Sequence, residues 1–450
     1  MKRWITASFI LVVLFLGTAV LGWLALPHVI DALPGSIRGR LPEEVIALVT
    51  TPLPTALPAP QIGSQNTPFR IVIPTIGPEG ATETAPAVST ETPIIETAET
   101  VSATEPTPTL APSSTPSPEP TATEIPPPPS AHIDGMKVIP QKFNNCGPTN
   151  LSMTLNYYDE TRDQLEIAVV LKPHEDDRNV SPEELVSYVN EQTSLRAEAY
   201  SGGDLTLLKH LLAAGFPVIV EKGLIENEAQ GWIGHYVTVF GYDDTRQEFD
   251  TLDSFLGPWD SSGLPVSYTK MAEYWRHFNH TFVLVFRPEQ ENQVREILGP
   301  IMTDPLLMWQ QAALEAQQQL ETEPNNAFIW FNLGTNLTHL ATLTGQMVYY
   351  EGAAAAFDRA REIGLPFRML WYQFQPYPAY LAVGRYEDVS TLVNAVLSTS
   401  GGLDVEETYY YKGKLLEAMG NVSGATVAYQ QAVQLNPGYE AAAAALEAVK

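Results

Sequence analysis

The sequence predicts an α+β domain followed by an all-α domain of helical repeats, both placed behind an apolar N-terminal segment and a proline-rich linker. Three observations lead to this prediction. Residues 51–130 hold 19 of the 37 prolines, so this stretch is not a folded domain. Between about residues 132 and 291, helix patterns come first and strand patterns follow, which is the α+β order. From about residue 292 to the end, the chain is rich in Ala and Gln and reads as helical.

The first element, residues 1–27, is predicted to be a membrane anchor. Lys2 and Arg3 are positively charged, and the 23 residues of Trp4–Leu26 that follow carry no charge. At about 1.5 Å rise per residue, a helix of this length spans the roughly 30 Å hydrocarbon core of a bilayer. The charges before the span favour a cytoplasmic N-terminus and an extracytoplasmic remainder. A cleaved signal peptide is the alternative, but the apolar stretch is long for one and has no small-x-small cleavage pattern.

The second element, residues 28–131, is predicted to contain a disordered stalk. No Lys or Arg occurs between Arg70 and Lys137, and Thr, Pro, Glu and Ser dominate. Such a composition cannot bury enough apolar surface to offset the entropy of ordering, and its prolines favour an extended chain. Over the whole chain, 25 Lys and Arg face 52 Asp and Glu, giving a net charge of −27. Nucleic acid is therefore excluded as an expected partner.

The third element, residues 132–291, is predicted to be the α+β domain. Leu151, Leu155 and Tyr158 form a helical stripe, Ser181-Pro182 is a helix start, and a third helix is expected over residues 205–214. Four later segments have strand character, namely 217–220, 235–240, 248–252 and 281–286.

The fourth element, residues 292–450, shows a repeat pattern. Small and aromatic residues recur at the spacing of the 34-residue tetratricopeptide unit, in which two antiparallel helices pack closely; they are Tyr409, Gly413, Leu416, Gly420, Ala425, Tyr429, Ala432 and Pro437. Trp330, Leu333 and Gly334 open a less regular unit. We expect about three helical pairs with a capping helix over 439–449 and a protein partner as ligand. Generic helical hairpins without a binding groove are the alternative.

The single cysteine, Cys146, is the strongest candidate for chemistry. It leads directly into the first predicted helix, where unpaired backbone N–H groups and the helix dipole favour the thiolate. Gly147 after it permits close approach of a substrate backbone, and the amide of Gln141 before it is a candidate donor to a developing oxyanion. A buried, inert cysteine is the alternative. One cysteine also excludes an intrachain disulfide, and we expect neither a metal nor a cofactor.

A cysteine nucleophile needs a base, and His235 is the histidine at the head of a strong strand pattern. The next strand ends at Asp253, which a turn between the strands would place beside His235 to orient its ring. Trp232 and Gly234, next to this histidine, are candidate walls of a substrate cleft; a plain core aromatic is the alternative for Trp232. A core histidine and a turn-capping aspartate are the alternatives for His235 and Asp253.

Together, Gln141, Cys146-Gly147-Pro148, Gly234-His235-Tyr236, Gly241-Tyr242-Asp243 and Asp253 resemble the bacteriocin-processing, double-glycine cysteine peptidases, family thirty-nine of the papain-like clan, especially the stand-alone members. The resemblance covers roughly residues 135–288. It implies a papain-like fold with Cys146 as nucleophile, His235 as general base and then acid, and Asp253 as orienting residue. It also implies an oxyanion hole formed by Gln141 and the backbone N–H of Cys146.

The sequence therefore predicts a membrane-anchored, extracytoplasmic cysteine peptidase whose helical repeats recruit a protein. Two other functions fit parts of the pattern. One is a catalytically silent module of the cell envelope that holds peptides and scaffolds a complex. The other is a cell-wall amidase, because a stalk suits wall substrates and the Cys/His chemistry is shared.

Overall fold

A computed structural model of the chain describes residues 126–174, 176–225, 231–399 and 401–450, the short segment 56–61, and the single residues Gly22, Leu26 and Val29. The rest of the predicted anchor and stalk lies outside the described residues. Residues 56–61 and 130–131 fall in the predicted disordered stalk but pair with folded elements. Segment 56–61 and residues 127–450 belong to one compact unit. Within the described part of the chain, no helix has both the length and the apolar character needed to cross a membrane.

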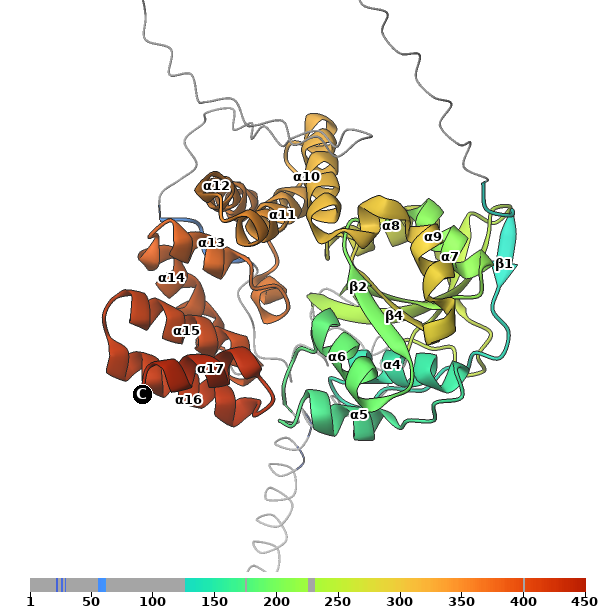
Figure 1. Ribbon diagram of the computed structural model, residues 1–450, viewed down its shortest axis with the longest axis horizontal. Helices are drawn as coiled ribbons and strands as arrows, with labels where there is room; N and C mark the ends of the chain where they lie inside the picture. Colours follow the sequence, from blue (N-terminus) through green and yellow to red (C-terminus); the bar gives the residue numbers. More distant parts are fainter. Residues whose placement is uncertain are drawn as a thin grey trace, which may run out of the picture. The chain divides into compact units, whose positions relative to one another are not determined.

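A seven-stranded antiparallel sheet forms the centre of the first folded domain (Figure 1). The strand order is β2-β7-β3-β4-β5-β6, and β1 pairs with the far end of the long strand β4. The strands are β1 Ser130–His132, β2 Arg196–Tyr200, β3 Val218–Ile225, β4 Trp232–Asp243, β5 Glu248–Leu252, β6 Leu264–Ser267 and β7 Phe282–Phe286.

The sheet is covered by helices on both faces, because its central strands are apolar on both faces. Val218 and Val220 of β3 pack into one apolar cluster and Ile219 into another, as the two-residue period of a strand requires. The helices of the Ile219 face are α4 Cys146–Tyr157, α5 Gln164–Leu171 and α6 Pro182–Gln192. The helices of the other face are α7 Leu205–Ala213, α8 Tyr268–Arg276 and α9 Glu291–Thr303.

The helix start predicted at Ser181-Pro182 is confirmed, and local hydrogen bonds explain it. Ser181 caps α6 by accepting from the backbone N–H of Glu184, and the Glu184 carboxylate accepts in return from the N–H of Ser181. Helices α5 and α8 and strands β1, β2 and β6 were not among the predicted elements. Strands β1 and β6 are only 3 and 4 residues long, and β2 mixes Arg196 and Glu198 with alanines. Such short or polar strands form because the sheet pairs them and not because of their own pattern.

The C-terminal region is helical to its end, after a short 3₁₀ turn η1 Pro288–Gln290 that precedes α9. Its elements are α10 Pro305–Thr322, α11 Ala327–Thr344, α12 Met347–Ile363, η2 Phe367–Trp371, α13 Pro376–Ala382, α14 Tyr386–Leu397, η3 Gly401–Asp404, α15 Glu406–Ala418, α16 Val422–Leu435 and α17 Glu440–Ala448. We call α10–α17 the helical array. Helix α11 packs chiefly on α12, and α15 on α16. Gly413 of α15 lies directly under the Tyr429 ring of α16, where a Cβ atom would come within 2.2 Å of the ring. That these pairs are tetratricopeptide units remains a prediction.

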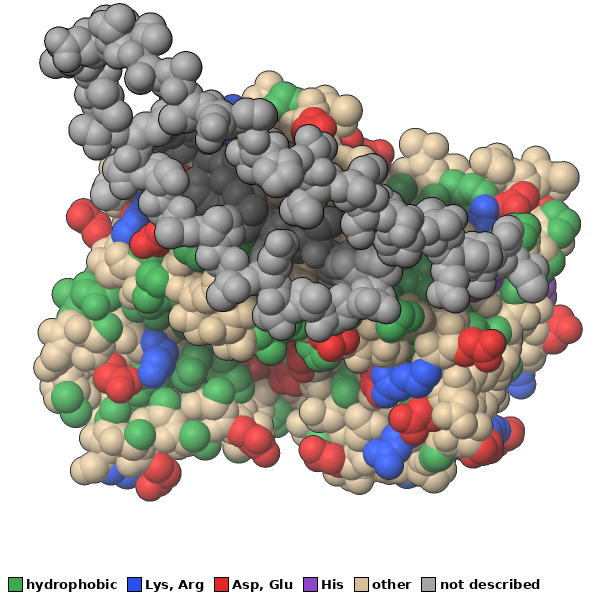
Figure 2. Space-filling view, turned by 45° about the horizontal axis from the view of Figure 1, so that its top comes forward, with side chains coloured by type: hydrophobic (Ala, Val, Ile, Leu, Met, Phe, Trp, Pro, Cys, Tyr) green, Lys and Arg blue, Asp and Glu red, His purple; other side chains and the backbone are tan. Residues whose placement is uncertain are grey.

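The helical array contacts the α+β domain next to the start of strand β4. The side-chain amide of Gln373 donates to the carbonyl of His277 at 2.9 Å, and that of Asn332 to the carbonyl of Arg276 at 2.8 Å. Trp232 and Phe278 of the α+β domain belong to the apolar cluster of the array. On the face shown in Figure 2, acidic and basic side chains are interspersed and do not form a single-sign patch.

Candidate active site

The thiol of Cys146 stands at the first residue of α4, and a buried glutamine fixes the loop that leads to it. The side chain of Gln164, on α5, donates to the carbonyl of Pro140 and accepts from the backbone N–H of Lys142, at 2.9 and 2.8 Å. It also accepts from the side-chain amide of Asn145, the residue before the thiol, at 2.9 Å. Because three points of the loop bond to one buried side chain, the position of Cys146 is set before any substrate arrives.

Three of the predicted site residues meet at this helix start. His235 lies on β4 and hydrogen-bonds to the thiol of Cys146, and its Nε2 lies 3.0 Å from Oδ1 of Asp253. Since Nε2 faces the carboxylate, Nδ1 is the ring nitrogen that faces the thiol. Asp253 follows β5, and its Oδ1 also accepts from the backbone N–H groups of Phe255 and Leu256 at 2.9 and 2.8 Å. The carboxylate is therefore held from three directions.

The electrostatics of these residues favour an ion pair of thiolate and imidazolium. Burial alone raises the pKa of the Cys146 thiol, but the hydrogen bond and positive charge of His235, with backbone hydrogen bonds from Tyr236 and Gly147, bring that pKa below its usual value. Burial lowers the pKa of His235, yet the charge and hydrogen bond of Asp253 and the contact with Cys146 raise it to about 9. Burial raises the pKa of Asp253, but the charge and hydrogen bond of His235 and the charge of the buried Lys222 outweigh this effect and hold that pKa at about 2.

A fully buried asparagine, Asn150, ties the three segments of the site together. Its side-chain amide donates to the carbonyls of Cys146 and Tyr236, each at 2.9 Å, and to the hydroxyl of Ser254 at 3.2 Å. Its oxygen accepts from the Thr238 hydroxyl at 2.8 Å. The helix of the thiol, the strand of the imidazole and the residue after Asp253 are thus bonded to one side chain. The sequence does not single out Asn150, because three of its four partners lie about ninety or more residues further along the chain.

Gln141, the predicted oxyanion donor, is oriented by Ser254. The Ser254 hydroxyl donates to Oε1 of Gln141 at 2.8 Å, and the backbone N–H of Gln141 donates to the Ser254 carbonyl at 2.8 Å. With Oε1 accepting from Ser254, the donor nitrogen Nε2 is the end of the amide left to interact with a substrate. The structure therefore fixes which end of the side chain faces Ser254.

A small cavity lies beside the thiol. Its lining includes Cys146 and both predicted glycines, Gly147 and Gly234, together with Asn144, Arg178, Asn179, Val180, Glu221, His235, Tyr236 and Tyr372. Its volume is about 10 Å³, which is space for about one water molecule. A Cβ atom at Gly234 would lie 2.9 Å from the ring of Tyr372, so only glycine lets that ring approach. This cavity is too small to hold a peptide residue.

The helical array supplies two contacts at this cavity that the sequence did not reveal. Tyr372, which follows η2, is itself a lining residue. Asn179, another lining residue, donates from its side-chain amide to Glu407 of α15 at 3.2 Å. Both contacts join residues that are far apart in the sequence, and no sequence pattern near Cys146 predicts them.

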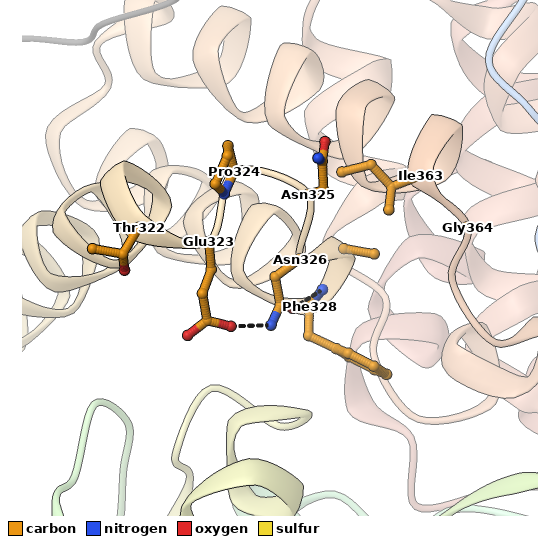
Figure 3. A pocket seen from close by; sticks show the side chains of 9 residues that line it. Thr322, Glu323, Pro324, Asn325, Asn326, Phe328, Ile363 and Gly364 are labelled. Atoms are coloured by element: carbon orange, nitrogen blue, oxygen red, sulfur yellow. Dashed lines mark hydrogen bonds between the residues drawn. The ribbon is translucent and has the colours of Figure 1, made fainter.

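Trp232, predicted to wall the cleft, lies elsewhere. It does not line the cavity; its ring is buried, stacks on Phe278 with ring centroids 5.6 Å apart, and donates from Nε1 to Nδ1 of His277 at 3.0 Å. The physical reason is that the array covers the start of β4, so the tryptophan becomes core of the domain contact. A separate open depression at the α10–α11 turn, lined by residues such as Glu323, Asn326 and Ile363, contains none of the candidate catalytic residues (Figure 3).

The α+β domain resembles a known protein family. Residues 133–283 match the model of the Peptidase C39-like family. A crystal structure described as a C39-like peptidase from Bacillus anthracis aligns with 18% identity over 35% of this chain and 98% of its own, with a TM-score of 0.30. The peptidase domain of Streptococcus ComA, a bifunctional ABC transporter involved in quorum sensing, aligns with 16% identity over 34% of this chain and 98% of its own, with a TM-score of 0.27. The comparison with curated proteins found no similar sequence.

The chain thus carries a C39-like peptidase domain of papain-like α+β fold, followed by a helical C-terminal region. A domain of this family suggests a cysteine peptidase, with a peptide or protein as substrate.

Proposed function

We propose that the protein is a cysteine peptidase that hydrolyses peptide bonds through Cys146, His235 and Asp253. The observation that carries the proposal is the contact of the half-buried thiol with buried His235, whose other ring nitrogen lies 3.0 Å from Asp253. This is the arrangement that nucleophilic catalysis by cysteine requires: a nucleophile beside a base that a third group orients.

In the proposed reaction the Cys146 thiolate adds to the carbonyl carbon of the scissile bond, and the negative charge moves to the carbonyl oxygen. Gln141 Nε2 and the backbone N–H of Cys146 stabilise that oxyanion. The imidazolium of His235 then gives its proton to the leaving amine as the C–N bond breaks, leaving a thioester. Neutral His235 next takes a proton from water as the water oxygen attacks the thioester. Breaking of the C–S bond then releases the carboxylic acid and restores the thiolate and the imidazolium.

The test uses the full chain in detergent and measures the rate at which iodoacetamide alkylates it across pH. The chain has a single cysteine, so the rate reports Cys146 alone. The wild-type inflection should lie below the ordinary thiol pKa of about 8.5, and His235→Ala should move it upward. His132→Ala is the matched control, because that histidine is half exposed and lies on β1. An ordinary inflection in all three proteins would contradict the proposal.

The hydrolytic step needs its own measurement. Incubating the full chain with a peptide library should give cleavage products by mass spectrometry, and Cys146→Ala should abolish them while leaving the thermal unfolding midpoint nearly unchanged. Retention of peptide binding without products in the wild type would indicate the silent binding module instead. Release of stem peptides from purified cell wall would indicate the amidase.

We also propose that residues 4–26 hold the chain in a membrane with the catalytic domain outside the cytoplasm. The support is the uncharged stretch behind Lys2 and Arg3. The chain should resist extraction of membranes with alkaline carbonate, and in intact cells an added protease should degrade the catalytic domain. Extraction into the soluble fraction would contradict the membrane anchor. Protection of the catalytic domain from protease in intact cells would contradict its place outside the cytoplasm.

A further inference from the structure

A short extended segment from the N-terminal part of the chain, Ala56–Gln61, lies on the helical array. Ala56 forms an antiparallel bridge with Pro366, and the backbone N–H of Leu57 donates to the carbonyl of Leu365 at 3.0 Å. The side chain of Leu57 belongs to the apolar cluster of the array, and the residue is only 5% exposed. The segment is thus anchored by an inserted leucine, which distinguishes it from a chain that merely passes over a surface.

A buried arginine of the array recognises the backbone of this segment. The side chain of Arg361, on α12, is 1% exposed. Its Nε donates to the carbonyl of Pro58 at 2.8 Å and its Nη2 to the carbonyl of Ala59 at 2.9 Å. Burying a guanidinium costs free energy unless its N–H groups are hydrogen-bonded. The two carbonyls of the segment supply the acceptors that the buried Arg361 side chain requires.

The other edge of the Arg361 guanidinium is fixed inside the array. Its Nη1 donates to Asp388 Oδ1 at 2.8 Å and to the Tyr380 hydroxyl at 3.0 Å. Arg385 also pairs with Asp388, through Oδ2. The guanidinium is therefore held in place by α13 and α14 while Nε and Nη2 face the segment. This is a pre-organised donor pair for two successive carbonyls.

The prolines of the segment match the bonds that the array offers. Pro58 and Pro60 have no N–H to donate, and the flanking residues Leu57 and Gln61 both donate theirs, Gln61 to Asp388 Oδ1 at 3.1 Å. The side-chain amide of Gln61 also donates to the Thr391 hydroxyl at 3.2 Å. Because its prolines already favour an extended chain, the Leu57-Pro58-Ala59-Pro60 segment lies here with little loss of conformational entropy.

We propose that the face formed by α12, Leu365–Pro366, α13 and α14 is a binding groove for extended Leu-Pro-x-Pro peptides, and that residues 56–61 of the same chain occupy it. The groove is distinct from the catalytic cavity, and this inference does not depend on peptidase activity. Occupation in cis benefits from a high effective concentration, so the groove excludes other peptides of this kind until the segment leaves.

The test uses a fluorescent synthetic peptide with the sequence of residues 54–63 and measures its anisotropy with the full chain in detergent. Leu57→Asp in the chain should release its own segment and open the groove. This variant should bind the peptide at least about tenfold more tightly than the wild type. Adding Arg361→Gln should weaken that binding about tenfold or more, because two charge-assisted hydrogen bonds are lost.

Arg359→Gln in the Leu57→Asp chain is the matched control. Arg359 lies on the same helix but pairs with Glu362 and Asn325 at the surface, so its loss should leave peptide affinity unchanged. Arg361→Gln also removes a buried ion pair with Asp388 inside the array, so a second probe is needed. It is the same peptide with its leucine replaced by aspartate, which should not bind the Leu57→Asp chain. Equal affinity of wild type and Leu57→Asp for the original peptide, or no binding by either, would overturn the proposal. So would a wild-type dimer that Leu57→Asp converts to monomer, because the segment would then come from a second copy.

Discussion

His235 and Asp253 face each other across 3.0 Å, and both side chains are almost completely buried. A buried carboxylate that keeps its charge stabilises the protonated imidazole. This explains why the pKa of His235 is raised to about 9 although burial alone would lower it. The imidazolium is therefore present across neutral pH, and it is lost only as the pH rises through about 9.

Replacing Asp253 with Asn should move the alkaline limb of activity to lower pH. The variant keeps an acceptor oxygen for Nε2 but removes the charge, so the pKa of His235 falls from about 9 and the imidazolium is lost earlier as pH rises. A shift of about one pH unit or more is expected in the pH profile of kcat. Asp253→Ala also removes the orienting bond and should lower kcat by about 10² to 10⁴. Asp250→Asn is the control: Asp250 lies on the preceding strand β5 and pairs with Arg246, so its loss should leave the profile in place. An unchanged profile in Asp253→Asn would contradict this interpretation.

Asn150→Ala should weaken both stability and thiol reactivity. The change leaves the carbonyl of Tyr236 and the hydroxyls of Ser254 and Thr238 without their shared partner inside the fold. We expect about 2 to 4 kcal/mol lower free energy of unfolding in urea and slower alkylation of Cys146 near neutral pH. Thr238→Val removes one of these bonds and should give a smaller loss of both. If Asn150→Ala unfolds at the wild-type urea concentration, the asparagine does not bind the segments together as inferred.

Gln141 and Ser254 should act as one unit in a double-mutant cycle. Gln141→Ala removes the proposed oxyanion donor and should lower kcat by about 10² to 10³. Ser254→Ala leaves the amide in place but removes the hydroxyl that holds its Oε1, so a smaller loss is expected. In the Gln141→Ala background, Ser254→Ala should have almost no further effect on kcat, because the amide it orients is gone. Additive losses would show that Ser254 acts by another route.

Local patterns in the sequence were enough to place the elements that carry the chemistry. The capping box at Ser181 and the apolar run of β4 are short-range signals, and both elements formed where they were expected. The meeting of Cys146, His235 and Asp253 could be proposed because a helix start and two successive strands leave few ways to place them. Their roles in catalysis remain predictions.

What the sequence could not predict depends on contacts between distant segments. Asn150 is an ordinary helix residue until β4 and Ser254 pack around it. Trp232 resembles a cleft residue because it adjoins Gly234, but the array buries it. Arg361 and Leu57 are separated by about three hundred residues, and neither has a local pattern that indicates a partner. Contacts between residues so far apart produce no hydrophobic periodicity that a single sequence could reveal.

The ring of Tyr372 should limit what reaches the thiol. It comes from the helical array, lines the cavity beside Cys146 and packs against Gly234. Tyr372→Ala should therefore raise the rate of Cys146 alkylation by a bulky maleimide several-fold more than the rate with iodoacetamide. Phe328→Ala is the matched control, because Phe328 stacks on His277 at the same domain contact without lining the cavity. If both variants raise the two alkylation rates alike, the domain contact as a whole, and not the Tyr372 ring, restricts access to Cys146. If neither variant raises either rate, reagents reach the thiol from a side that Tyr372 does not cover.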